Sequence, residues 1–309
     1  MTALLLIILG VAAAGAGGEL FVRGSVALAM RMRIAPGIVG ATVVAFATSS
    51  PELSVGVNAA LDGAPEISLG DALGSNVVNI ALILGLALAL AGATPRRADL
   101  NRDLPVALIA PVITLGLAHD GTISRIDGVV LLGCFIAWLT VTVRQAARER
   151  DATAGMLGEH NRRLIARDVT VGLLLLILAG RLIVLAAQDI GDALGWDTFT
   201  VGAIMVAIGT STPELATTIT ARLRGHDEVS VGTVLGSNIF NGLLIVGVAA
   251  VITPIRASGP ELMLALGAGV LSLLLILPGR SDRLGRGRGV ALLVLYVTYV
   301  TALLSIHSG

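Results

Sequence analysis

Residues 39–79 read VGATVVAFATSSPELSVGVNAALDGAPEISLGDALGSNVVN, and residues 201–241 read VGAIMVAIGTSTPELATTITARLRGHDEVSVGTVLGSNIFN. The two stretches align without a gap at an offset of 162 residues, and about half of their positions are identical. A long internal repeat of this kind arises when a chain is built from two related structural units. The repeat therefore divides the chain into two halves of the same design.

The composition of the chain is typical of an integral membrane protein. Of its 309 residues, 55% are hydrophobic and only 14% are charged, and the mean hydropathy is +0.90. A soluble domain needs more polar surface than this, whereas a membrane-spanning helix needs about 20 apolar residues in a row. Hydropathy and helix breakers predict ten transmembrane helices, at residues 3–29, 35–61, 67–92, 104–118, 126–146, 168–188, 198–222, 229–253, 259–278 and 289–306.

Charge balance and rare residues argue against several other classes of protein. Basic and acidic residues balance at 21 each, whereas a nucleic-acid-binding protein needs a clustered basic excess. The single cysteine, Cys134, can form no internal disulfide, and four scattered histidines cannot build a zinc site. No histidine accompanies the repeated serines, which argues against an intramembrane hydrolase. We expect a protein that is not an enzyme, has no cofactor, and contacts the lipid bilayer but no nucleic acid.

The arginines predict the orientation of the chain in the membrane. When the loops between the ten spans are assigned alternately to two sides, one side collects 17 arginines and the other only Arg125 and Arg256. Basic loops remain in the cytoplasm. The arginine-rich side is therefore predicted to be cytoplasmic, with both termini outside the plasma membrane.

Each half of the chain contains five predicted spans. Because five is odd, the second half must cross the membrane in the opposite direction to the first. We assign residues 1–146 to the first five-helix repeat, 147–167 to a cytoplasmic linker, and 168–309 to the second, inverted repeat. Inverted repeats with a site at their interface are typical of secondary transporters.

Glu52 and Glu214 occupy equivalent positions deep inside apolar stretches of the two halves. A carboxylate at the middle of a membrane is costly unless something compensates its charge. A single buried Glu is often structural, but the same costly group recurs in both halves with the same polar neighbours. This recurrence indicates a functional site at the interface of the repeats.

The spacing of the neighbouring polar residues places them on shared helix faces. Thr48 lies one turn before Glu52, and Ser75 lies one turn before Asn79. The second half repeats both spacings over residues 210–214 and 237–241.

Pro51 and Pro213 predict breaks in the two spans that carry the glutamates. Proline donates no backbone hydrogen bond and disfavours helix at the residue before it, so carbonyls near Ala47 and Gly209 should be freed. Discontinuous helices at the middle of a membrane are tolerated only where they line an enclosed or watery cavity. The site therefore offers carboxylate, hydroxyl, amide and backbone oxygens without sulfur or imidazole, a ligand set that hard cations such as Na⁺ and Ca²⁺ prefer.

With these motifs the sequence resembles the sodium/calcium exchangers of the calcium/cation antiporter superfamily. The resemblance rests on two copies of Thr-Ser-x-Pro-Glu, each followed by Gly-Ser-Asn-x-x-Asn. It implies that the first and sixth spans slide past a static core. By position, it implies ion ligands at Thr48, Ser49, Glu52, Ser75, Asn79, Thr210, Ser211, Glu214, Ser237 and Asn241. The chain departs from the family pattern in having Asn241 where Asp is frequent and Ala47 where Gly is usual.

The expected function is a secondary antiporter that exchanges Na⁺ for Ca²⁺ by alternating access. Two ionised carboxylates are neutralised by one Ca²⁺ or by two Na⁺, so both loads suit one site in turn. An antiporter coupled to protons or K⁺ is an alternative, since a buried Glu can also take up a proton. A cation channel is an alternative of another class, although its selectivity would come from a ring around an axis. We expect the protein to function as a monomer.

Five further charged residues receive structural interpretations. Glu19 and Arg181 are equivalent by the repeat and are expected to face solvent near a helix end or to pair structurally. Arg23 is expected to extend its charge to a membrane interface. Glu66 and Glu228 are expected near helix starts, where a carboxylate suits the helix dipole.

Overall fold

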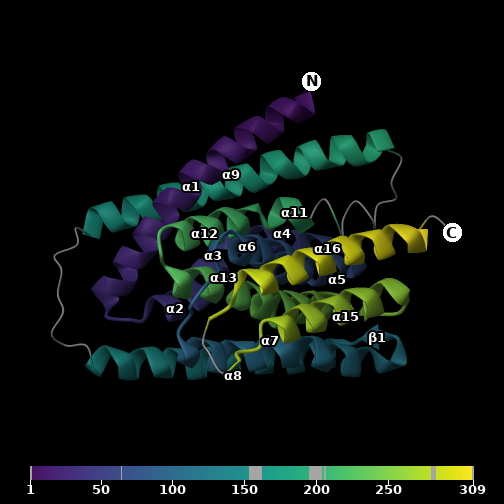
Figure 1. Cartoon of the computed structure of the whole chain (residues 1–309). Coiled ribbons are helices and arrows are strands. Elements are labelled where there is room, and N and C mark those ends of the chain that lie inside the picture. Colours follow the sequence, from purple (N-terminus) through teal and green to yellow (C-terminus); the bar gives the residue numbers. More distant parts are fainter. Residues whose placement is uncertain are drawn as a thin grey trace.

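The computed structural model describes residues 2–63, 65–152, 162–194, 204, 207–279 and 283–307. Over these residues the chain is almost entirely helical, as its continuous apolar runs predict (Figure 1). The first half contains α1 (Thr2–Met32), α2 (Pro36–Val39), η1 (Gly40–Val44), α3 (Ala45–Thr48), α4 (Ser50–Leu61), α5 (Pro65–Val77), η2 (Val78–Leu84), α6 (Gly85–Ala91), α7 (Arg97–Leu117), η3 (Ala118–Asp120), β1 (Thr122–Ile123) and α8 (Arg125–Ala152). The second half contains α9 (Arg162–Leu194), α11 (Ala207–Thr210), α12 (Thr212–Leu223), α13 (Asp227–Ile239), η5 (Phe240–Ile245), α14 (Val246–Ile252), β2 (Ile255–Arg256), α15 (Pro260–Leu275) and α16 (Arg286–His307).

Length and composition identify membrane-spanning candidates among the described helices. Six stretches qualify: Ile8–Met32, Pro65–Ala91, Arg97–Asp120, Arg125–Arg148, Asp227–Ile252 and Arg286–Ile306. A bent pair, Pro36–Thr48 with Ser50–Leu61, makes a seventh, and Pro260–Leu275 is apolar but shorter. The all-helical membrane class is confirmed. The number ten stays a prediction, because six or seven candidates are found in the part of the chain that the structure describes.

Several helices extend beyond the predicted spans. The fourth span was expected to begin at residue 104, but α7 begins at Arg97, because Arg102 and two aspartates in its first turns neutralise one another. Helix α8 continues to Ala152 and α9 begins at Arg162, so both helices extend into the predicted linker, residues 147–167. The beginning of the seventh predicted span, residues 198–203, lies outside the described residues.

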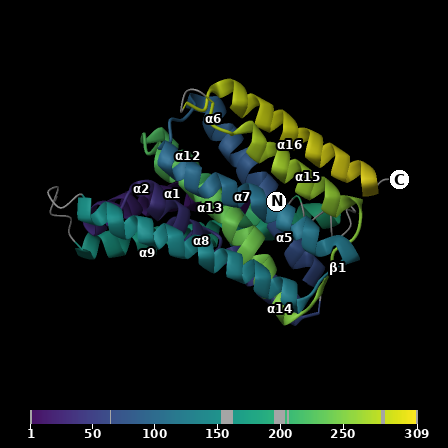
Figure 2. The ribbon, with the colours of Figure 1, turned by 90° about the horizontal axis from the view of Figure 1, so that it is seen from below.

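Two central helical stretches form the core of the molecule. The span windows of Pro65–Ala91 and Asp227–Ile252 are each 78% buried, whereas those of α7, α8 and α16 are 22–33% buried. The outer helices present large apolar side chains outward, such as Ile126 on α8 and Val297 on α16. In water this exposure would be unfavourable, but lipid solvates it. Figure 2 shows α15 and α16 side by side along one edge of the bundle.

Both repeated Thr-Ser-x-Pro-Glu segments break their helices, as the prolines predict. The breaks fall at Ser49 and Ser211, which leave helical geometry, and Pro51 and Pro213 stand in the first turn of the next helix. In the first half the two helical segments meet at 47°. The breaks place the start of α4 and the start of α12 inside the protein.

Among the helical elements whose bounds are given above, three are π-helical, a feature that hydropathy does not predict. They are η1, η2 and η5, and the latter two follow α5 and α13 directly. A π-helical stretch inserts an extra residue into the helical turn, and such stretches occur frequently at functional sites. Here η2 carries Asn79 and η5 carries Asn241.

Helices α1 and α9 pack along one another on one side of the bundle, with α8 on the other side (Figure 1). Glycines allow the close approach. A Cβ on Gly172 of α9 would lie 2.6 Å from the backbone nitrogen of Phe21, and one on Gly17 would lie 2.9 Å from Cβ of Leu175. Small residues let membrane helices approach until their backbones are in contact.

Contacts between loops join segments that the sequence assigns to the same side of the membrane. Strand β1 pairs with β2 in the antiparallel sense, joining two loops predicted to be external. Ala93 pairs with Leu284, and the Thr94 backbone N–H donates to Asp227 at 2.6 Å, which joins three loops predicted to be cytoplasmic. Loops that lie on opposite sides of a bilayer could not touch, so this pattern favours the alternating assignment.

A labelling experiment tests the orientation. In a Cys134→Ala background, Asp62→Cys should react with an impermeant thiol reagent in intact cells, because its loop is predicted to be external. Ala98→Cys should react only after the membrane is permeabilised. Both positions are exposed on the protein, so a lack of reaction cannot be caused by burial of the cysteine. The reverse labelling pattern would show that the orientation is wrong.

Candidate cation site

Glu52 and Glu214 lie in the first turns of α4 and α12, immediately after the two helix breaks. Both side chains are fully buried. Each glutamate is placed at a helix N-terminus, where free backbone N–H groups and the helix dipole favour negative charge. The helix breaks that the prolines produce therefore position both carboxylates.

Hydrogen bonds cross reciprocally between the two halves. The hydroxyl of Ser49 donates to Oε1 of Glu214 at 3.0 Å, and the hydroxyl of Ser211 donates to Oε1 of Glu52 at 3.2 Å. Each half thus supplies a carboxylate and the hydroxyl that contacts the other half's carboxylate. The repeated residues of the two halves therefore form a single centre.

The remaining predicted hydroxyls show that the symmetry is incomplete. Ser237 donates to Oε1 of Glu214 at 3.1 Å, whereas its counterpart Ser75 is buried without a hydrogen-bond partner. Thr48 bonds to the carbonyl of Val44 at 3.1 Å and also faces Glu214.

Asn79 and Asn241 are fully buried, and neither the oxygen nor the nitrogen of either amide has a hydrogen-bond partner. The second carboxylate oxygens of Glu52 and Glu214 are also buried without a partner. An unpartnered buried polar group costs about 1–3 kcal/mol, and more if charged. Such a concentration of unsatisfied oxygens fits a bound cation.

The donor set consists of oxygens. Among the described residues, no three His, Cys, Asp or Glu side chains are grouped closely enough to hold a metal ion by themselves. A cation here would therefore need hydroxyl and amide oxygens beside the carboxylates. Such neutral oxygen ligands suit Na⁺ and Ca²⁺.

Sequence reasoning missed Asp71, which is 3% exposed on α5. Thr210, a predicted ligand, donates its hydroxyl to Oδ1 of Asp71 at 3.4 Å and to the carbonyl of Ala207 at 3.3 Å. The signal that could have found Asp71 is an acidic residue inside the apolar run before Gly-Ser-Asn. It was overlooked because the repeat has Thr233 at the equivalent position.

Sequence reasoning also missed Asn76 and Asn238, the asparagines of the repeated Gly-Ser-Asn motif. The Asn238 side chain donates to the backbone carbonyl of Asn76 at 3.2 Å. Both residues are buried, and they join the central helices α5 and α13. The motif therefore also connects the two halves.

Of the other charged residues, two form ion pairs with partners that the sequence did not identify. Arg23 forms an ion pair at 2.8 Å with Asp168, which lies on α9. The sequence predicted that the charge of Arg23 extends to a membrane interface, but it did not predict this partner. Glu19 pairs with Arg224, which confirms a structural role. The side chain of Arg181 lies outside the described residues. Glu66 and Glu228 lie in the first turns of α5 and α13, as expected.

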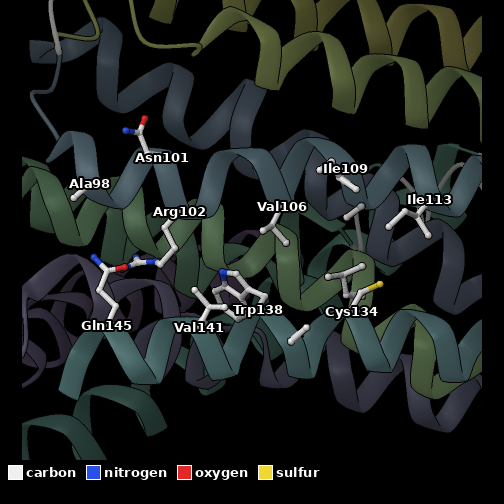
Figure 3. Close-up of a pocket in the computed structure, with 13 residues that line it drawn as sticks. Ala98, Asn101, Arg102, Val106, Ile109, Ile113, Cys134, Trp138, Val141 and Gln145 are labelled. Atoms are coloured by element: carbon white, nitrogen blue, oxygen red, sulfur yellow. The ribbon is translucent and has the colours of Figure 1, made fainter. Parts of the chain in front are cut away.

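A cavity of about 640 Å³ lies between α7 and α8, and none of the ten predicted ion ligands lines it (Figure 3). Its walls are mostly apolar, with Arg102 and Gln145 together at one end (Figure 3). Arg102 is paired with Asp103 at 2.6 Å, and Asp103 also accepts from Trp138 at 3.0 Å. The cavity lacks both glutamates, so it is not the site that the repeats form.

A buried, oxygen-lined centre, shared by two related halves of a helical membrane protein, is the arrangement expected of a cation transporter. Residues 2–144 and 169–305 match the model of the sodium/calcium exchanger protein family. The chain belongs to this family. It is a membrane antiporter of the cation/Ca²⁺ class.

Individual proteins support the same assignment. The chain is 34% identical to the inner membrane protein YrbG of Escherichia coli, over 87% of each chain. It is 25% identical to the sodium/calcium exchanger MaX1 of Methanosarcina acetivorans, over 97% of each. Its structure is similar to that of the sodium-calcium exchanger NCX_Mj, with a TM-score of 0.84, 29% identity, and coverage of 98% of this chain and 99% of that one.

Proposed function

We propose that this protein exchanges Na⁺ for Ca²⁺ by alternating access of one ion centre. The observation that carries the proposal is the reciprocal bonding of Ser49 to Glu214 and of Ser211 to Glu52. Because each half completes the other half's carboxylate, a movement of one half relative to the other would alter the whole centre at once. Such a movement would expose the ions to one side of the membrane at a time.

The ten predicted residues are proposed as ion ligands. The two glutamates balance one Ca²⁺ or two Na⁺ in turn, so the two loads compete and exchange follows. The hydroxyls and amides replace the water shell of the ion. They are Thr48, Ser49, Ser75, Asn79, Thr210, Ser211, Ser237 and Asn241, beside Glu52 and Glu214.

The proposed architecture has ten spans in two inverted repeats, residues 1–146 and 168–309, joined by a cytoplasmic linker. The protein acts as a monomer in the plasma membrane, with both termini outside. Helices α1 and α9 are proposed to slide past the remaining helices. The close packing of α1 along α9, which their glycines allow, supports the movement of these two helices as a pair.

Coupling to protons or K⁺ is the alternative within the same class, and a cation channel is the alternative of another class. The two halves meet at one enclosed centre rather than forming a ring of ligands around an axis, which favours an antiporter over a channel.

Ion flux in proteoliposomes tests the proposal. We expect an outward Na⁺ gradient to drive uptake of ⁴⁵Ca²⁺ against its concentration gradient, because Na⁺ and Ca²⁺ compete for one centre. Equal outward K⁺ or proton gradients should not drive it. Liposomes without protein and a Na⁺ ionophore serve as controls. Uptake that follows the K⁺ or proton gradient instead would reject Na⁺ coupling, and downhill flux without coupling would indicate a channel.

A further inference from the structure

We propose that the ion pair between Glu19 on α1 and Arg224, the residue directly after α12, is a cytoplasmic latch that keeps the cytoplasmic side of the transporter closed. In the opposite state of the transport cycle, Asp62 and Arg181 form the matching external latch. This inference rests on the proposed function, because it assigns one ion pair to each of the two states of alternating access.

Helix α1 covers α12 between the ion centre and the cytoplasmic loop. Helix α12 has Glu214 in its first turn and ends at Arg224, whose loop is predicted to be cytoplasmic. A Cβ on Gly18 of α1 would lie 3.0 Å from the backbone oxygen of Ala216 and 3.1 Å from the hydroxyl of Thr220, both on α12. The two helices are therefore in contact, and the ion pair holds the cytoplasmic end of that contact.

The cytoplasmic latch belongs to a series of charges that joins α12 to both helices proposed to move. Arg23 lies one turn after Glu19 on α1 and is attracted to it. Arg23 also pairs with Asp168 on α9 at 2.8 Å. Because α1 and α9 are connected in this way, the pair between Glu19 and Arg224 holds both helices on α12. Ion pairs within such a network contribute more than isolated exposed pairs do.

The internal repeat contains the positions of this ion pair a second time, with the charges exchanged. The offset of 162 residues takes Glu19 to Arg181, a position on α9. The same offset takes Asp62 to Arg224. If each residue were charged only to contact water at its own helix, a reversal at one position would not require a reversal at the other. The joint reversal is expected of two residues that pair with each other.

Asp62 and Arg224 are equivalent in the structure as well as in the sequence. Helix α4 ends at Asp62 and α12 ends at Arg224. Each of the two residues is followed by a glycine with a φ of +78°, Gly63 or Gly225. The matching turns therefore place an acid on the predicted external side and a base on the predicted cytoplasmic side.

The positions on α4 that correspond to the contact with α1 are uncovered in this structure. Asp62 is exposed, and none of the ion pairs in the described part of the chain includes it. Ser54 and Asn58 on α4 are exposed, whereas their repeat equivalents Ala216 and Thr220 are half-buried beside α1. The structure therefore corresponds to a state that is closed on the cytoplasmic side and open on the external side.

The opposite state follows from the inverted repeat. When two inverted halves exchange conformations, each helix takes the place of its counterpart. Helix α9 would then cover α4 as α1 now covers α12, which would bring Arg181 to Asp62. One latch thus stabilises each state, and the loss of either latch shifts the equilibrium toward the other state.

Thiol labelling measures this equilibrium independently of transport. In a Cys134→Ala background, Thr220→Cys reports opening of the cytoplasmic side and Asn58→Cys reports opening of the external side. The protein is held in nanodiscs, so that a thiol reagent reaches both faces. We expect Glu19→Gln to speed labelling of the cytoplasmic reporter and slow that of the external reporter by about two- to fivefold, the range for exposed ion pairs. Asp62→Asn should produce the opposite changes.

A double-mutant cycle identifies the partners within each latch. Arg224→Gln should match Glu19→Gln, and the double variant should add nothing further, because either change alone breaks the pair. Arg181→Gln should relate to Asp62→Asn in the same way. Asp127→Asn at the start of α8 is the charge-matched control, because its carboxylate accepts hydrogen bonds from the loop just before that helix. It should leave both labelling rates unchanged.

Unchanged labelling in the Glu19 and Asp62 variants would overturn the inference, and so would changes in the same direction in both. Additive effects within a latch would show that its two residues do not pair. Na⁺-driven ⁴⁵Ca²⁺ uptake by the wild type tests the proposed function separately. Uptake without the labelling shifts rejects only the latches. Absence of uptake rejects the proposed exchange, and with it the assignment of the two latches to a transport cycle.

Discussion

Replacing Glu52 or Glu214 by Gln should abolish Ca²⁺ transport. Both carboxylates are fully buried at the junction of the halves, and each supplies half of the charge that balances Ca²⁺. Removing one partner of a buried charge pair costs about 3–5 kcal/mol. Ca²⁺ affinity should therefore fall by at least about a hundredfold, since each 1.4 kcal/mol is a factor of ten. The measurement is Na⁺-driven ⁴⁵Ca²⁺ uptake by reconstituted protein.

The variants should still fold, which separates transport from stability. A Gln carbonyl oxygen can accept the hydroxyls of Ser49 and Ser211 as the carboxylate oxygens do. Glu66→Gln is a matched control, because Glu66 is exposed in the first turn of α5. It should transport at the wild-type rate. A Gln variant at position 52 or 214 that exchanges Ca²⁺ normally would show that the glutamates are not the ion ligands.

Gly232→Val should prevent assembly of the two halves. Gly232 lies on α13, and a Cβ there would be 2.7 Å from the backbone oxygen of Gly37 and 3.2 Å from the nitrogen of Ala41. Overpacking against side chains already costs about 1–3 kcal/mol. Here the opposing atoms belong to the backbone of α2 and η1 and cannot rotate away. We expect loss of the monodisperse peak in size-exclusion chromatography, or a large fall in the melting temperature.

The matched control is Gly133→Val on α8, which also changes Gly to Val within a helix. Gly133 is exposed, and a Cβ there would meet no atom within 4 Å. Its chromatographic profile and melting temperature should stay close to those of the wild type. If Gly232→Val were equally well folded, the close approach of α13 to the first half would not be required for assembly.

Much of the fold is determined by signals that are local in the sequence. Apolar runs identify helices because lipid offers no partner to an unsatisfied backbone. Pro51 and Pro213 break their helices through their own geometry, so the positions of the breaks are predictable from the chain alone. The repeat then predicts that Glu52 and Glu214 are equivalent.

Two features of the helices were not predictable from hydropathy. The start of α7 at Arg97 depends on ion pairs formed by Arg102, which outweigh its unfavourable hydropathy. Hydropathy contains no pattern that predicts the π-helical stretches, which carry Asn79 and Asn241.

The sequence by itself determined that the chain is a helical membrane protein with two related halves and repeated oxygen ligands. Only the tertiary structure decided how those ligands combine. It paired each carboxylate with the hydroxyl of the opposite half, and it brought Asp71 against Thr210 across 139 residues of chain. The physical reason is that hydropathy and helix breaking act over a few residues. The neighbours of a buried side chain depend instead on how closely packed segments such as α13 and the α2–η1 stretch approach, which residues like Gly232 control.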